Sequence, residues 1–386
     1  MVPASSVTTN TLAAGKTFLR VNIPSGALTA FFAQIPTTAA GIGTPSTSTF
    51  GRAVAGHFVT QVMPIGVCAI DLIQGGRRPV AGGLPDELTE FGFRRGIAYN
   101  IPQLNPLGGS SALPMWLNPL NAPPAACNPA NASTAVMRPF VCTGSSTVVT
   151  SVPGLVYVNT GVAPIPMQRA LNSRFDDFSG GGNACDPASA PPDINIRPYD
   201  FAAPPRLPHD WMDPGANTYP SQQTISLDPV TGKPYVSPPL TTGQYGALWS
   251  YSRAVRAVGA SPNATAGTDF VLADWSNLYA NNTADITASG YPASATPPYY
   301  KTSGKYFLGP PARPGRINRR VLNVAIVDCS GLAAGPGLAC ATLPVLGVGK
   351  FFMQTPAFLN GPNATLDTEF SGLLTPFPDP TIRLYK

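Results

Sequence analysis

Hydrophobic and polar residues alternate most clearly toward the C-terminal end, within residues 313–358. Leu322, Val324 and Ile326 fall on one side of an extended chain, and the residues between them fall on the other. A loop rich in glycine and proline follows, and a second apolar run covers Val345–Gln354. The pattern predicts two antiparallel strands joined by a loop, that is, a β-hairpin.

The N-terminal part of the chain predicts a second hairpin. In residues 16–36, Leu19, Val21 and Ile23 alternate with polar neighbours, as expected for a half-buried strand. A turn-rich segment then leads to a second predicted strand, Thr49–Met63.

The middle of the chain is rich in loops. Prolines recur through residues 71–150, and because proline lacks an N–H donor we expect no central strand or long helix there. A short strand is predicted at residues 148–159. Apolar residues at helical spacing predict three helices, at residues 167–178, 243–258 and 268–279.

Together these elements predict an α+β protein. We expect the strands before residue 70 and after residue 317 to share one antiparallel sheet, with the middle packed on it. The predicted organisation is therefore N-terminal strands at 1–70, a loop-rich insertion with helices at 71–310, and C-terminal strands at 311–386.

The composition predicts a folded protein with unusually few charged residues. Charged residues make up 11% of the 386 positions, against about 25% in typical globular domains. Hydrophobic residues reach 44%, which is enough for a sizeable core. The polar N-terminus shows neither a signal peptide nor a membrane-spanning run, so we expect a fragment, a soluble ectodomain or a processed form.

Six cysteines favour disulfides in an oxidising compartment. They are Cys68, Cys127, Cys142, Cys185, Cys329 and Cys340. The absence of a Cys-x-x-Cys motif and the presence of only two histidines argue against zinc. The simplest pairing joins near neighbours, Cys329 with Cys340 and Cys127 with Cys142, although spacing does not decide among the alternatives. Six buried thiols are the other interpretation.

Four arginines lie close together in residues 313–320. They could contact an anionic surface or partner. We favour a simpler interpretation, in which arginines beside a strand keep its end solvated and prevent edge-to-edge pairing. Aromatic residues of the nucleic-acid-binding type do not accompany them, so no nucleic-acid partner is expected.

Residues with catalytic or metal-binding chemistry are few. His209 precedes Asp210 and Asp213 in a proline-flanked loop, a weak pattern for a metal. His57 lies in a predicted strand without a nucleophile motif nearby. Asp176 and Asp177 end a predicted helix, and we expect both to be solvated. We expect no catalytic residue, no metal and no cofactor.

Gly347 and Gly349 lie on the same face of the second C-terminal strand. Their missing side chains would let another element, such as a helix, pack closely there. A twist or bulge in the strand is an equally good explanation.

Several segments resemble TadG-like proteins of the TadE/TadG group, which are minor pilins or pseudopilins of tight-adherence (Flp) pilus systems. At the C-terminal end these segments are Arg319–Asp328, the loop flanked by Cys329 and Cys340, Val345–Pro356 and Thr368–Leu374. At the N-terminal end the segment is Phe18–Cys68. The resemblance implies an envelope or pilus protein without enzymatic activity. Family members carry an N-terminal hydrophobic helix, and this sequence departs from them in showing none.

The favoured hypothesis is a structural or assembly component of a bacterial surface appendage, located outside the cytoplasm. Its expected partners are other pilus or envelope proteins or copies of itself, with the membrane reached only through a segment not present here. A secreted adhesin or self-assembling filament subunit is the first alternative. An extracytoplasmic hydrolase that uses His57, or His209 with Asp210, is the second.

Overall fold

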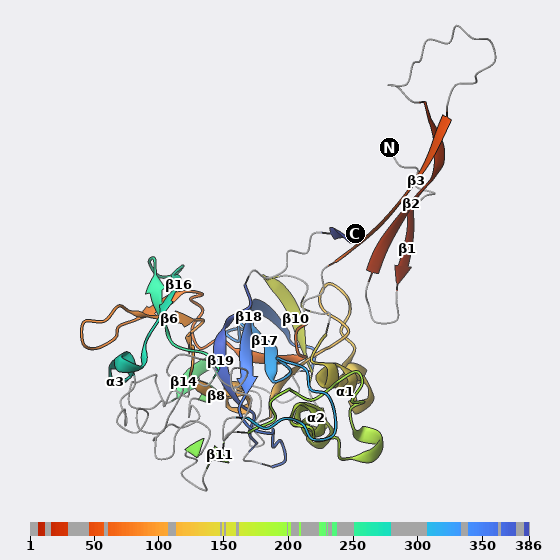
Figure 1. Ribbon diagram of the computed structural model, residues 1–386. Coiled ribbons are helices and arrows are strands. Elements are labelled where there is room, and N and C mark those ends of the chain that lie inside the picture. The colour runs from red at the N-terminus through yellow and green to blue at the C-terminus, as the bar shows by residue number, and fades with distance from the viewer. Residues whose placement is uncertain are drawn as a thin grey trace, which may run out of the picture. The chain divides into compact units, whose positions relative to one another are not determined.

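A computed structural model gives the arrangement of the chain (Figure 1). It describes residues 7–11, 17–29, 46–57, 61–106, 113–146, 149, 152–159, 162–198, 200–201, 208–209, 224–228, 230, 234–237, 251–278, 307–332, 339–361, 364–375 and 382–385. Contacts divide the chain into two units, one formed by residues 1–59 with 378–386 and the other by residues 60–377. Strands predominate over helices, which agrees with the predicted α+β class.

The first unit is a four-stranded antiparallel sheet with the order β1-β2-β3-β20. The strands are β1 (Val7–Thr11), β2 (Thr17–Thr29), β3 (Ser46–His57) and β20 (Ile382–Tyr385). The predicted N-terminal hairpin is confirmed as β2 and β3, the two long strands in Figure 1.

The second unit is built on a seven-stranded sheet with the order β10-β9-β4-β17-β18-β19-β8. Its strands are β4 (Ile65–Cys68), β8 (Ala98–Asn100), β9 (Met115–Leu117), β10 (Gly154–Asn159), β17 (Val321–Val327), β18 (Thr342–Met353) and β19 (Asp367–Leu373). Because β10 also pairs with β18, five of these strands form a closed ring of pairings. The predicted C-terminal hairpin is confirmed as β17 and β18.

One sheet shared by both ends of the chain is the part of the fold prediction that is wrong. The two hairpins belong to different sheets, and the ends meet only through single strands. β3 pairs with β20 in the first unit, and β4 pairs in parallel with β17 in the second. The sheet of the C-terminal hairpin also contains β8, β9 and β10, which come from the middle of the chain.

The core of the second unit is aliphatic and aromatic. Val324 and Ile326 of β17 are fully buried, as their alternation predicted. Phe93, Phe351 and Phe370 pack together with ring centroids 5.2–5.6 Å apart, spacings that are typical of favourable aromatic pairs.

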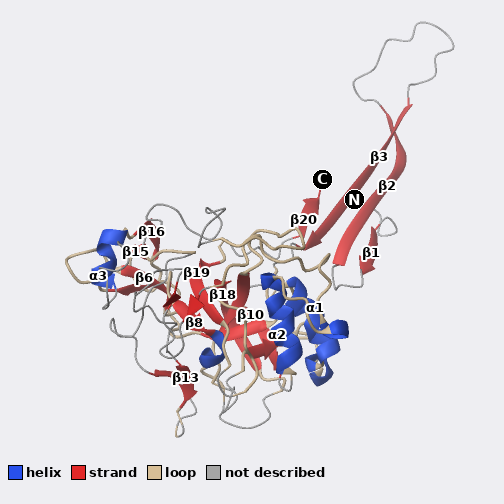
Figure 2. Cartoon of the chain, turned by 60° about the horizontal axis from the view of Figure 1, so that its bottom comes forward, coloured by secondary structure: helices blue, strands red, loops and turns tan. Residues whose placement is uncertain are grey.

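Three helices are described, and one was not predicted. They are α1 (Thr134–Thr143), α2 (Pro164–Asn172) and α3 (Trp275–Leu278). α2, with the 3-10 turn Ser173–Phe175, confirms the helix expected at 167–178. α1 was missed because Pro139 lies inside it, a position that ordinarily disfavours a helix. Figure 2 shows α1 and α2 next to each other, beside β10 and β18.

The other two predicted helices are corrected in large part. Within residues 243–258, positions 243–250 lie outside the described residues, and β15 (Val255–Val258) is a strand with alternating burial. Within residues 268–279, only η8 (Leu272–Asp274) and α3 are helical. β9, a strand inside the sheet, also overturns the expectation of no central strand in residues 71–150, because its three residues contain no proline.

Smaller sheets complete the description. β5 (Gly76–Arg78), β6 (Glu87–Glu90), β7 (Phe93–Arg94), β15 and β16 (Thr265–Asp269) form a five-stranded sheet. Two-stranded sheets join β11 (Asp200–Phe201) with β12 (Pro208–His209), and β13 (Thr224–Leu227) with β14 (Pro234–Ser237). Single 3-10 turns lie at η2 (Ile101–Leu104), η4 (Pro129–Ala132) and η6 (Gly181–Asn183).

Candidate functional site

All six cysteines form disulfides, but not with the expected partners. The bonds join Cys68 to Cys329, Cys127 to Cys340 and Cys142 to Cys185. The predicted local pairs are wrong because the pairing of strands, rather than closeness in sequence, brings cysteines together. In the parallel pair of β4 and β17, Cys68 lies opposite Val327, two residues before Cys329.

These bonds indicate the redox conditions in which the protein folds. Two of the three join cysteines more than 200 positions apart, with separations of 261 and 213 residues. Disulfides of this kind form and persist in oxidising compartments. The three disulfides therefore indicate an extracytoplasmic environment.

The arginine run at residues 313–320 is not a solvated strand end. Arg320 is fully buried and Arg319 is half-buried, whereas Arg316 is exposed. Arg313 forms an ion pair with Asp176 at 3.0 Å and lies over the ring of Phe178. The favoured prediction of solvated arginines is therefore wrong for most of the run.

The Arg320 guanidinium contacts backbone carbonyls and two aromatic rings. Its guanidinium donates hydrogen bonds to the carbonyl oxygens of Met353, Gln354, Asn195 and Arg197, at 2.8–3.2 Å. The guanidinium carbon lies 4.5 Å from the centroid of the Phe175 ring and 4.4 Å from that of Phe352. Tyr251 stacks on the other face of Phe352 at 4.8 Å, so a layered stack joins β17, β18 and the end of α2.

Two other arginines bind the C-terminal ends of the helices. Arg319 donates to the carbonyl oxygens of Cys142 at 2.7 Å and Thr143 at 2.8 Å, the last residues of α1. Arg174 donates to the carbonyl of Val141 in α1 at 3.0 Å and to that of Ala170 in α2 at 3.1 Å. Cations are favoured at these positions because the last carbonyls of a helix carry partial negative charge.

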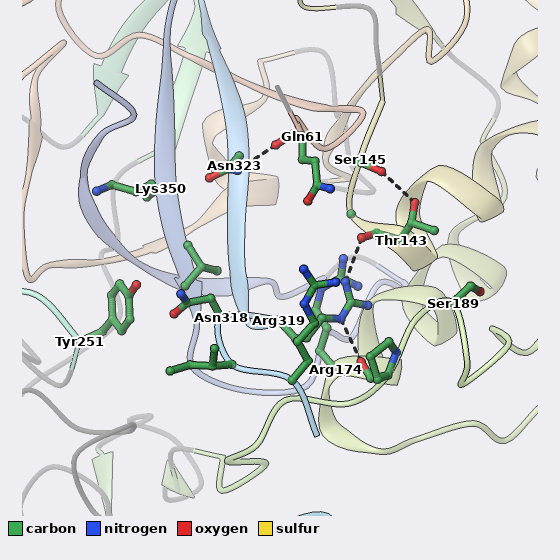
Figure 3. Close-up of a pocket in the computed structure, with 15 residues that line it drawn as sticks. Gln61, Thr143, Ser145, Arg174, Ser189, Tyr251, Asn318, Arg319, Asn323 and Lys350 are labelled. Carbon is green, nitrogen blue, oxygen red and sulfur yellow. Dashed lines mark hydrogen bonds between the residues drawn. The ribbon is translucent and has the colours of Figure 1, made fainter. Parts of the chain in front are cut away.

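A cavity of about 610 Å³ opens beside these two arginines (Figure 3). Most of its lining comes from four regions of the second unit: the segment before β4, the end of α1, the end of α2 with the loop after it, and β17 with the residues preceding it. Tyr251 and Lys350 of β18 complete it. Four cationic residues contribute to the lining: Arg174, Arg316, Arg319 and Lys350. None of the described residues that line it is acidic or a histidine.

The electrostatics of the cavity reflect crowded positive charge. Burial, with the charge of Arg319 beside it, lowers the pKa of Arg174 well below its usual value. Burial and the neighbouring Arg316 lower the pKa of Arg319 to about 10. Asp193, fully buried nearby, opposes both shifts. Hydrogen-bond donors and excess positive charge suit this cavity to an oxyanion.

Lys350 and Tyr251 lie apart from the two guanidinium groups in Figure 3. Burial lowers the pKa of Lys350, and Arg95 lowers it further. Burial raises the pKa of Tyr251 to about 12, with added repulsion from the carboxylate of Glu369. The tyrosine hydroxyl is therefore protonated at neutral pH.

The two histidines of the hydrolase alternative belong to different units. His57 lies in β3 and His209 in β12, while Asp210 and Asp213 fall outside the described residues. Asp176 is engaged by Arg313 and is not solvated as expected. Across the described ranges, no group of three histidine, cysteine or acidic residues is placed to hold a metal.

Arg174 and the cavity escaped the sequence reasoning. Arg174 lies inside the predicted helix 167–178 and precedes the apolar Phe175 in the 3-10 turn Ser173–Phe175. A cation in the last turn of a helix is common, and nothing in the sequence marks this one as buried. The only available signal was its position at a helix end.

Aromatic rings, rather than a helix, fill the space left by the two glycines of β18. A Cβ at Gly347 would lie 2.8 Å from the Phe91 ring. At Gly349 it would lie 2.7 Å from Phe351, 3.0 Å from Phe370 and 3.2 Å from Ile326. The pairing of β18 is also irregular next to each glycine, which fits the alternative of a bulge.

Substituting Gly349 with alanine is expected to lower the free energy of unfolding by about 1–3 kcal/mol, because the new methyl group overpacks a ring cluster. Urea unfolding measures this change, and Gly331→Ala is the matched control because a Cβ there meets nothing within 4 Å. Equal stability of the two variants would contradict the packing argument.

Comparisons with models of known protein families, with curated proteins and with solved structures find no match to this chain. Within the part of the chain that the structure describes, no helix has the length and apolar character needed to cross a membrane.

Proposed function

We propose that this protein is a non-enzymatic component of a bacterial surface appendage, of the tight-adherence pilus type, and acts through protein–protein contacts. The observation that carries the proposal is the set of three disulfides in the second unit, two of which link segments more than 200 residues apart. Such cross-linking suits a protein that must keep its shape outside the cell.

The resemblance to TadG-like proteins supports the same proposal. The residues that carry it are prominent in the structure: Arg320 is fully buried, Cys329 is disulfide-bonded, and buried Glu369 accepts hydrogen bonds from the backbone of Tyr251 and Ser252.

Deletion of the gene in the source bacterium tests the proposal. Electron microscopy is expected to show a loss of surface pili, and the wild-type gene supplied in trans should restore them. Normal numbers of pili in the deletion strain would contradict a role in assembly. Filaments formed by the purified protein alone would favour the self-assembling subunit instead.

A double histidine variant separates this role from the hydrolase alternative. His57→Ala with His209→Ala removes both histidines of the chain. We expect the double variant to restore pili as well as the wild-type gene does, because a structural role does not use their chemistry. Failure to restore pili, with normal amounts of folded protein, would support the hydrolase.

A further inference from the structure

The cavity beside α1 and α2 holds more positive charge than helix capping explains. Arg174 and Arg319 bind helix carbonyls, which are neutral groups and leave both charges in place. Arg316 adds a third guanidinium at the cavity wall, and Asp193 is the carboxylate that acts on Arg174 and Arg319. Among the described residues, three guanidinium groups therefore line a cavity that has no acidic residue in its lining.

Some guanidinium N–H groups of the arginines beside the cavity are also unused by the described residues. Arg174 is 1% exposed, and its Nε–H has no hydrogen-bond acceptor among them. Arg319 uses three of its five N–H groups, on the carbonyls of Pro191, Thr143 and Cys142. Buried donors without acceptors are uncommon in native proteins and are costly to maintain.

We propose that this cavity binds a ligand through a phosphate group. A phosphate monoester carries a charge of about −2 near neutral pH, opposite in sign to the four cationic side chains of the lining. Guanidinium groups recognise phosphate oxygens through paired N–H bonds. The neutral amide of Gln61 in the lining can contact the rest of the ligand. A volume of about 610 Å³ is adequate for a small phosphorylated molecule or a lipid headgroup.

Isothermal titration of the purified chain with inorganic phosphate tests the proposal, and sodium nitrate at equal ionic strength is the control for general screening. We expect phosphate to bind and nitrate not to bind. Arg316→Ala is expected to weaken phosphate binding about tenfold, the loss of one charge-assisted hydrogen bond. Because Arg316 is exposed, this variant should fold normally.

Arg77→Ala is the matched control, since it removes the same charge from an arginine in β5 that does not line the cavity. It should bind phosphate as the wild type does. No phosphate binding, or equal weakening by both variants, would overturn the proposal.

Flotation with phosphatidic acid and phosphatidylcholine vesicles distinguishes the source of the phosphate, because phosphatidic acid carries a phosphate monoester. Binding to phosphatidic acid vesicles alone, reduced by Arg316→Ala, would support a lipid headgroup. Phosphate binding in titration without flotation would support a soluble phosphorylated ligand.

Discussion

Replacement of Arg320 with alanine is expected to lower the free energy of unfolding by about 3–5 kcal/mol. The guanidinium supplies donors to four backbone carbonyls, those of Met353, Gln354, Asn195 and Arg197. Alanine would remove the guanidinium donors of these carbonyl oxygens. It would also open a space between the rings of Phe175 and Phe352. Urea unfolding, followed by tryptophan fluorescence, measures the loss.

Arg316→Ala is the matched control for this prediction, because it lies in the same run and is exposed. We expect it to change stability by less than about 0.5 kcal/mol. Arg320→Lys should fall between the two, since lysine keeps the charge but offers three donors on one atom and cannot stack as a plane. If Arg320→Ala and Arg316→Ala unfold at the same urea concentration, the buried arginine does not stabilise the fold.

The hairpins were predictable because their information is local. Alternation at Leu322, Val324 and Ile326 reports the burial of one strand face, and each of the three is buried. The helix at 167–178 was predictable for the same reason, since its apolar spacing is read within one segment. Local patterns determine an element wherever neighbouring residues alone decide its conformation.

Long-range pairing was not predictable from these patterns. Alternation shows that β17 has a buried face, but not that β4 pairs with it in parallel. The same limit explains the cysteines: Cys68 and Cys329 meet because two strands meet, a fact absent from either segment alone. Helix α1 was missed for another reason. Proline is disfavoured inside helices, and Pro139 outweighed the weak helical pattern around it.

The candidate site was missed because distant segments form it and because the sequence does not show which arginines are buried. The cavity is lined from segments that lie far apart in sequence, from Gln61 to Lys350. Composition could show that arginines were concentrated near residue 316, but not which of them would be buried. Arg319 and Arg320 are neighbours in sequence, yet one lines the cavity at the helix ends and the other lies between two aromatic rings.

Removal of the Cys68–Cys329 disulfide by serine at both positions is expected to lower the free energy of unfolding by about 4 kcal/mol. Taken alone, a closed loop of 261 residues implies a loss of about 5.6 kcal/mol in the chain-entropy estimate. The intact Cys127–Cys340 bond shortens the effective loop in the unfolded chain. The path from Cys68 to Cys329 then passes through that bond and spans only about 70 residues.

The Cys142–Cys185 pair is the control that makes this argument testable. Its loop of 43 residues is not shortened by the other bonds, and the chain-entropy estimate gives a loss of about 4.0 kcal/mol. We therefore expect the two serine double variants to differ by less than about 0.5 kcal/mol, although their sequence separations differ about sixfold. A difference near 1.6 kcal/mol, measured from urea midpoints, would mean that the loops act independently.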